Sequence, residues 1–537
     1  MKNKKNQFKL RSLFTYILFI GLILFQTACK DDFAEVQNEK EMSHSLTAAR
    51  ADSRQQTILE NPYSVKNMIR AYAELATDGD IAKAEAVSGI RTSHLYVELN
   101  VDQEKLDALK ADSTLVMYPY RLDVQISDKE DSRNNSDSDF SDEIQTFYAA
   151  IPVDYKLPIA EYKVLEQLYI PDEEKLDNGG KVIESSVPQP NGVSAEDLVN
   201  KSLELTGNNE EQILKNSVAA RNNKWRPAGR ITMQDTELGT VGVEGLKIQA
   251  RRWFTTHTGF VDQNGYYQCD GTFKNPANYS FNFERYEFEI RGSISGVDGP
   301  KIEGNWNQHY QRNTRQNYHS NIFRAAFHYA YKNILNLRRP PQNGFWRTQL
   351  KIQANYFDDP DGNALGNHNP ARRFLGMGSA IHIYSPTRTS DDVYGTTIHE
   401  MAHASHWNMD KSNYNNGDLI VIESWARGVQ WALTRTVYST YNLAFRYNRL
   451  GYTGIVQDLI DGNKNVVTSQ YYDLNTKKSV NGPTRSYQDQ TSGYTIRQIE
   501  DALNGNRTWN GWKNKILLYS NSTSQNVQQG FNYWNTL

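Results

Sequence analysis

The sequence predicts a multidomain α+β protein with an N-terminal α+β domain, a small β-sandwich and a C-terminal α+β domain. A chain of 537 residues is long enough for more than one domain. Apolar and polar residues alternate between turn residues through 226–298, as in the strands of a sandwich. Apolar residues recur instead at helical spacing in 320–337 and 494–503. We divide the chain where these patterns change.

The first 28 residues have the pattern of a secretory signal peptide. A basic start is followed by a 13-residue apolar run, 13–25, which is too short to span a bilayer comfortably. Small residues then precede Cys29, and 29–58 is polar and has no firm period. We therefore expect residues 1–28 to be removed and 29–58 to form a flexible tether.

The cleavage region resembles the lipobox of bacterial lipoproteins. The charged residues Lys30, Asp31 and Asp32 that follow resemble the export signal of Bacteroidetes-type surface lipoproteins. The resemblance implies that Cys29 is lipidated and that the chain is held on the bacterial outer membrane, exposed at the cell surface, because acyl chains bury apolar surface in the bilayer. A plain signal peptide is the alternative. With Cys29 acylated, Cys269 has no partner for a disulfide.

The N-terminal α+β domain is predicted to cover 59–225 and to serve as an accessory unit. Its pattern predicts a helix over 62–75, strands over 94–99 and 115–126, and a charged loop over 127–142. Two roles fit this pattern equally, positioning of a substrate and simple structural support.

The β-sandwich, 226–298, resembles the carboxypeptidase regulatory-like (transthyretin-like) domain. The stretches that carry the resemblance are GRIT at 229–232, GLKIQ at 245–249 and DQNGYY at 262–267. Gly265 suits a turn that needs positive φ. The nearby Asp262 and Asn264 fit either turn chemistry or calcium ligation.

The C-terminal domain, 299–537, contains three further predicted elements around a histidine motif. A helix over 320–337 ends before two prolines, and a helix over 494–503 ends at a glycine. The run 373–384 ends as a strand, after which Ser390 and Asp391 offer an N-cap for the helix that carries the motif.

The motif itself is HEMAH, which consists of His399, Glu400, Met401, Ala402 and His403. Residues four apart lie on one face of a helix, so both imidazoles can reach one metal ion. Zinc bound in this way activates a water, and Glu400 stands beside it as a general base.

A catalytic zinc needs a third protein ligand and one open position. A second helix is predicted over 418–441, and it carries Glu423 twenty positions after His403. We therefore expect His399, His403 and Glu423 to bind Zn²⁺. His406 or Asp410 would serve if Glu423 were an ordinary helix carboxylate, and the two motif histidines could also be ordinary packing residues.

HEMAH followed by ESWARG resembles the gluzincin, or thermolysin-like, zinc metallopeptidases. The resemblance implies a zincin-like α+β catalytic domain, the three ligands above and Glu400 as the general base and acid. Many members place an acid where this chain has Arg427, so no residue is assigned to orient a zinc-binding histidine. The metzincin pattern fails at Met409, and a mucin-directed variant fails at Ala402 and His406.

Such folds bind substrate as an extended strand beside the motif helix, and 380–384 is the expected edge strand. The sequence thus predicts a surface-anchored zinc endopeptidase acting on a protein or peptide, including glycoprotein. The alternative is a non-catalytic glycan- or protein-binding lipoprotein with a structural or relic zinc site. Lysine plus arginine (59) do not exceed aspartate plus glutamate (62), so no nucleic-acid partner is expected. A hydrolase acting on another carbonyl also remains open.

Overall fold

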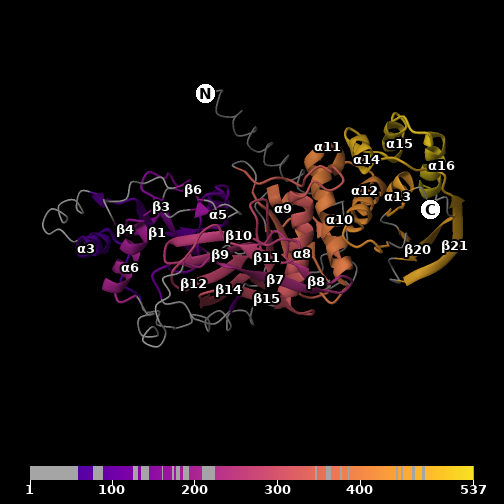
Figure 1. Cartoon of the computed structure of the whole chain (residues 1–537). Coiled ribbons are helices and arrows are strands. Elements are labelled where there is room, and N and C mark those ends of the chain that lie inside the picture. The colour runs from indigo at the N-terminus through magenta and orange to yellow at the C-terminus, as the bar shows by residue number, and fades with distance from the viewer. Residues whose placement is uncertain are drawn as a thin grey trace, which may run out of the picture.

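The computed structural model shows a mixed α+β protein with several separate sheets (Figure 1). It describes residues 58–76, 89–124, 131–134, 144–159, 161–171, 175–176, 182–184, 193–208, 224–344, 348–358, 365–374, 378–384, 386–442, 446–448, 451–461, 466–473 and 478–535. The predicted signal peptide, Cys29 and almost all of the tether lie outside these residues. Among the described residues, no helix combines the length and apolar character needed to cross a membrane.

The N-terminal unit is a three-stranded antiparallel sheet covered by helices. The sheet has the order β3-β1-β4, and a small hairpin, β5 and β6, lies apart from it. Tyr96 and Leu168 of the sheet share one apolar cluster with Met68 of α3 and Leu198 of α6. The elements are α3 (Val65–Leu75), β1 (His94–Val101), α5 (Gln103–Lys110), β3 (Gln145–Pro152), β4 (Lys163–Leu168), β5 (Lys175–Leu176), β6 (Val182–Glu184) and α6 (Ala195–Leu205).

The predicted helix 62–75 and strand 94–99 are confirmed as α3 and β1. The predicted strand over 115–126 is wrong within its described part, where Tyr118 makes only a single bridge to Tyr148. Pro119 has no N–H for a ladder, and Arg121 binds the Asp123 carboxylate next to it instead. The chain therefore bends and turns through 119–123, between isolated bridges at Tyr118 and Val124, rather than forming a strand.

Two sheets make up the β-sandwich. One has the order β10-β9-β12-β14-β2, and the other has the order β11-β7-β15 with β8 beside β7. Ile231 and Met233 of β7 and Ile248 and Phe281 of the first sheet belong to one core. The strands are β2 (Asp131–Asn134), β7 (Ala228–Asp235), β8 (Gly239–Gly242), β9 (Lys247–Arg252), β10 (Thr255–Phe260), β11 (Tyr266–Gln268), β12 (Ala277–Asn282), β14 (Ile294–Ile302) and β15 (Trp306–Tyr310).

Strand β2 corrects one expectation, because it falls inside the predicted charged loop 127–142 and pairs with β14. The other residues of that loop, apart from 131–134, lie outside the described residues. The turn at 262–266 has the predicted form. Asp262 accepts the backbone N–H groups of Asn264 and Tyr266, and Gly265 has φ 93°.

The sandwich and the C-terminal unit are continuous. Strand β14 runs to Ile302, and β15 then pairs with β7, so a boundary at 298 cuts a strand. Strand β13 (Phe288–Gly292) pairs in parallel with β16 (Leu350–Ala354) of the next sheet. Figure 1 shows the three parts in a row, with the N-terminal unit and the C-terminal helices at opposite ends.

The C-terminal sheet has the order β13-β16-β18-β17. Strand β18 (Ile381–Ile383) is bonded on both sides, so the predicted edge strand 380–384 is wrong. The edge is β17 (Gly366–His368), which runs antiparallel to β18. A strand of three residues is too short to be recognised from the alternation of apolar and polar residues. The run 373–384 ends as a strand, β18, as predicted, and it begins as the end of helix α9 (Pro370–Phe374).

Two long helices, α8 (Arg315–Tyr331) and α10 (Ser390–Met409), pack beside this sheet, and a third, α12 (Leu419–Thr434), packs on α10. The N-cap of the motif helix is Thr389 rather than the predicted Ser390 or Asp391. The Ser390 hydroxyl instead accepts the backbone N–H of Thr236, and the Thr236 hydroxyl accepts the backbone N–H of Ser390. Helix α8 starts and ends earlier than predicted, and residues 335 and 336 beyond it have positive φ. Helix α12 ends at residue 434 rather than 441.

The last part of the chain adds short helices and a three-stranded sheet, β19-β20-β21. The predicted helix 494–503 is confirmed as α14, with a capping box formed by Thr495 and Gln498 and with Gly505 at φ 80° beyond its end. The elements are α11 (Lys411–Asn415), β19 (Arg446–Asn448), α13 (Ile455–Ile460), β20 (Val466–Asp473), β21 (Lys478–Gln488), α14 (Ile496–Leu503), α15 (Trp509–Ile516) and α16 (Ser524–Asn535).

Candidate metal centre

Helices α10 and α12 carry the candidate metal ligands, and both helices are largely buried. Met401 and Ala402 of α10 and Trp425 and Ala426 of α12 are fully buried in one apolar core. These residues fix the rotation of each helix about its axis, because apolar side chains occupy the faces that pack. As a result, His399 and His403 of α10 face Glu423 of α12.

His399, His403 and Glu423 meet between the two helices. His399 Nε2 lies 3.1 Å from His403 Nε2. Glu423 Oε2 lies 3.2 Å from His399 Nε2 and 3.4 Å from His403 Nε2. All three side chains are buried, and each offers one ligand atom within 4.8 Å of the others. Among the described residues this is the one such group of histidine, cysteine and acidic side chains.

The charges of this cluster fit a bound cation. Burial alone would raise the pKa of Glu423, but His403 and the hydrogen bonds from both histidines hold it below its ordinary value. Burial would lower the pKa of His403, yet the Glu423 carboxylate raises it. A positive charge is thus favoured beside Glu423, and two imidazole nitrogens with one carboxylate oxygen are a donor set that zinc accepts.

Glu400 lies beside the cluster and is also buried. Burial raises the pKa of its carboxyl to about 8. Among the described residues, no hydrogen-bond or ion-pair partner holds this carboxylate. Gly366 of β17 packs against it so closely that a Cβ there would lie 2.9 Å from Glu400 Cγ and Oε1. Glu400 therefore stands between the edge strand and the ligands, where it can exchange a proton.

Tyr452 is a neighbour of the site that the sequence did not single out. Burial and the nearby Glu423 and Glu400 carboxylates raise the pKa of its hydroxyl, and its ring lies 5.8 Å from that of His399. The loop that holds it is tied to α12, because Ser424 donates to the Gly451 carbonyl and accepts from Thr453. The sequence offers no signal for Tyr452, since the contact depends on tertiary packing alone.

A second missed group consists of His368 and Tyr414. The His368 ring on β17 lies parallel to that of His403, with centroids 6.3 Å apart. The Tyr414 hydroxyl lies 3.5 Å from His368 Nδ1. The edge strand therefore places a polar ring next to the ligand cluster.

The alternative ligands do not join the cluster. His406 is buried next to Tyr414, and burial together with His403 lowers its pKa to about 3. Asp410 caps α11 by accepting the N–H of Asn413, and it also accepts the N–H of Gly505. The Nδ1 atoms of His399 and His403 are buried without a hydrogen-bond partner among the described residues. Among the described residues, no hydrogen bond at Nδ1 orients either ring.

The other residues considered for the site lie in different surroundings. Arg427, which replaces the acid of the resembled family, has its guanidinium 5.6 Å from the centroid of the Tyr452 ring. His382 of β18 contacts Arg372 and Asn355. The chain matches no protein-family model, no curated protein and no solved structure.

Proposed function

We propose that this protein is a zinc-dependent endopeptidase. The observation that carries the proposal is the meeting of His399, His403 and Glu423 in one buried cluster with the unpartnered carboxylate of Glu400 beside it. Metal-assisted peptide hydrolysis uses this combination, since a metal and a separate base act on the same water. The cluster contains three ligands among the described residues, which is the number that leaves a zinc position open.

Each residue has a distinct role in the proposal. Zinc, when bound, supplies a Lewis acid and lowers the pKa of a water. Glu400 takes a proton from the attacking water and passes it to the amine that leaves. A cation at the cluster also stabilises the Glu400 carboxylate, which brings its raised pKa down toward the range of a useful base.

Two units of the fold are assigned to domain types under this proposal. The C-terminal unit is a zincin-like catalytic domain, and the sandwich is a transthyretin-like domain. Strand β17 is a free sheet edge next to Glu400, which suits a substrate bound as an added strand. We further propose that the chain is a surface lipoprotein anchored through Cys29, with proteins, peptides or glycoproteins as substrates.

The experiment compares wild-type protein and Glu400→Gln on a mixed peptide library, with and without a chelator. The amide keeps the volume of Glu400 but cannot accept the proton. We expect chelator-sensitive cleavage by wild type, none by Glu400→Gln, and equal zinc in both. A wild-type chain that holds zinc but cleaves no peptide would favour the non-catalytic binding protein instead.

A further inference from the structure

A cavity of about 600 Å³ lies between the N-terminal unit and the sandwich, away from the metal centre. Helix α5 and the loop after it form one wall, and the five-stranded sheet forms the other. Tyr286 donates its hydroxyl to the Ala111 carbonyl, and Asn343 donates to the Lys110 carbonyl, so the walls are joined. A cavity of this size holds a small ligand.

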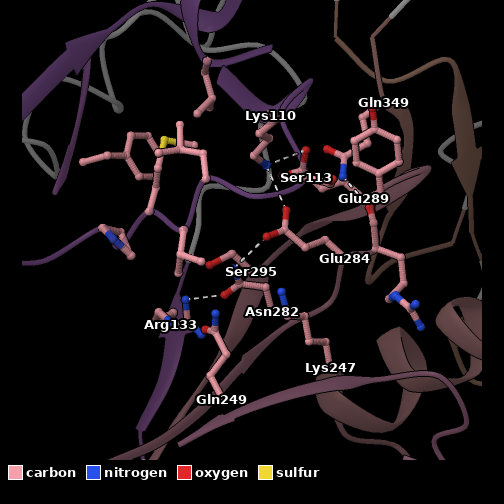
Figure 2. A pocket seen from close by; sticks show the side chains of 18 of the residues that line it. Lys110, Ser113, Arg133, Lys247, Gln249, Asn282, Glu284, Glu289, Ser295 and Gln349 are labelled. Atoms are coloured by element: carbon pink, nitrogen blue, oxygen red, sulfur yellow. Dashed lines mark hydrogen bonds and ion pairs between the residues drawn. The ribbon is translucent and has the colours of Figure 1, made fainter. Parts of the chain in front are cut away.

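The floor of the cavity is one face of the sheet. Lys247 and Gln249 are two residues apart on β9 and so point to the same side. Phe260 lies directly across from Lys247 on β10, and Ser280 lies across from Gln249 on β12. Asn282, two residues beyond Ser280, continues the row (Figure 2). An aromatic ring and several amide and amine groups therefore share one surface.

The charged groups around this floor are held in place before any ligand binds. Lys110 lies 3.0 Å from Glu284 and 3.3 Å from Glu289. Arg133 lies 3.3 Å from Asp298. It also donates a hydrogen bond to the Asn282 side chain (Figure 2). Four acidic and four basic side chains line the cavity. The cavity is thus rich in fixed polar groups but has no excess of either charge.

Several polar groups in the cavity still lack partners. Among the described residues, neither the Lys247 ammonium nor the Gln249 amide has a hydrogen bond or ion pair, and burial lowers the pKa of Lys247. Gln349 is 4% exposed, and its Oε1 atom is buried and has no hydrogen-bond partner among the described residues. The Lys247 and Gln249 side chains are only partly buried, so their polar groups are open to a ligand in the cavity.

We propose that this cavity binds an uncharged oligosaccharide. A sugar presents hydroxyl groups that both donate and accept, which suits the Gln249 amide and the Lys247 ammonium together. Its apolar C–H face suits the Phe260 ring, which is 53% exposed. Equal numbers of opposite charges favour a neutral ligand over an anionic one. This inference does not depend on the metal centre.

The test is calorimetric titration of the full chain in detergent with maltotriose, cellotriose, chitotriose and N-acetyllactosamine. Sialyllactose and a neutral decapeptide are the comparison ligands. The variants are Gln249→Leu and Phe260→Ala. Among the described residues the Gln249 side chain makes no hydrogen bond, and the Phe260 side chain is 53% exposed, so neither change removes a contact of the buried core. Tyr266→Ala is the matched control, since its ring is 57% exposed on the other sheet and does not line the cavity.

We expect saturable binding of at least one neutral oligosaccharide, weakened about tenfold or more by each cavity variant and unchanged by Tyr266→Ala. Thermal unfolding of each variant at the wild-type temperature confirms that the fold is intact. The proposal is overturned if none of the four neutral sugars binds, or if the peptide or sialyllactose alone binds. It is also overturned if sugar binding is the same in wild type and both cavity variants.

Discussion

At the residue scale, the position of Glu400 depends on the absence of one side chain on the neighbouring strand. Gly366 sits where any Cβ would lie 2.9 Å from Glu400 Cγ and Oε1 and from Thr396 Cγ2. The Glu400 side chain is the part that can shift, because it has more rotatable bonds than the β-branched Thr396 side chain on the same helix. The glycine therefore fixes where the proposed base stands.

Gly366→Ala should accordingly move Glu400 while leaving the ligands untouched. We expect peptidase kcat/KM to fall about 10- to 100-fold, because small displacements of a reacting group are costly, with zinc content unchanged. Gly344→Ala is the control, since a Cβ there meets nothing within 4 Å. Wild-type activity in Gly366→Ala would mean that Glu400 is not confined as we describe.

The meeting of the three cluster residues was predictable from the sequence for a physical reason. His399 and His403 are four apart, and helical geometry alone places them on one face. Glu423 followed from its place on the next helix. Tyr452 and His368 were not predictable, because they reach the site from a loop and a three-residue strand that tertiary packing brings there.

At the scale of elements, one buried carboxyl joins three parts of the C-terminal unit. Asp458 of α13 accepts hydrogen bonds from Trp534 of α16, at 2.7 Å, and from Tyr487 of β21. Burial raises its pKa from 3.8 to about 8. The folded protein therefore binds this proton over a range of pH in which the unfolded chain has released it.

The sign of the pH dependence follows from that difference. The stabilising contribution is complete below the unfolded pKa of 3.8 and is lost as pH rises through the folded pKa of about 8. Asp458→Asn cannot titrate. Between pH 5 and 7 the unfolding free energy of wild type should fall relative to that of Asp458→Asn by up to about 1.4 kcal/mol per pH unit. Urea unfolding of both proteins at pH 5 and pH 7 measures this difference. The same change in unfolding free energy with pH for wild type and Asp458→Asn would contradict the prediction.

Elements with a clear period were predicted, and those set by partners were not. α3, β1 and α14 follow from spacing and capping residues. The ends of α8 and α12 differ from the prediction because Lys332 after α8 has an extended backbone and the residues after α12 turn back to bond Leu433 and Thr434. Strand β2 was expected to be loop, since its sequence, DSRN, is polar and becomes a strand only by pairing with β14.

At the scale of the whole molecule, a buried ion pair fastens the N-terminal unit to the C-terminal sheet. Lys351 of β16 lies 2.5 Å from Asp107 of α5, and the two side chains are 5% and 7% exposed. Removal of one partner leaves a buried charge without compensation. The predicted division into separate domains thus misses a contact between residues far apart in the chain, which no local pattern encodes.

Lys351→Met should destabilise the protein by about 3 to 5 kcal/mol in urea unfolding. Arg388→Ala is the control, because its pair with Asp392 is half exposed and is worth under about 1 kcal/mol. The double variant Lys351→Met/Asp107→Leu should recover part of the loss. Equal costs for Lys351→Met and Arg388→Ala would show that this pair does not hold the units together.

The central claim is that His399, His403 and Glu423 together hold one zinc ion. The most direct measurement is the zinc content per chain of purified wild type and of His403→Ala after dialysis against metal-free buffer. The account predicts one zinc per wild-type chain and almost none in the variant. A wild-type chain without zinc, or a His403→Ala chain that keeps it, would contradict the account.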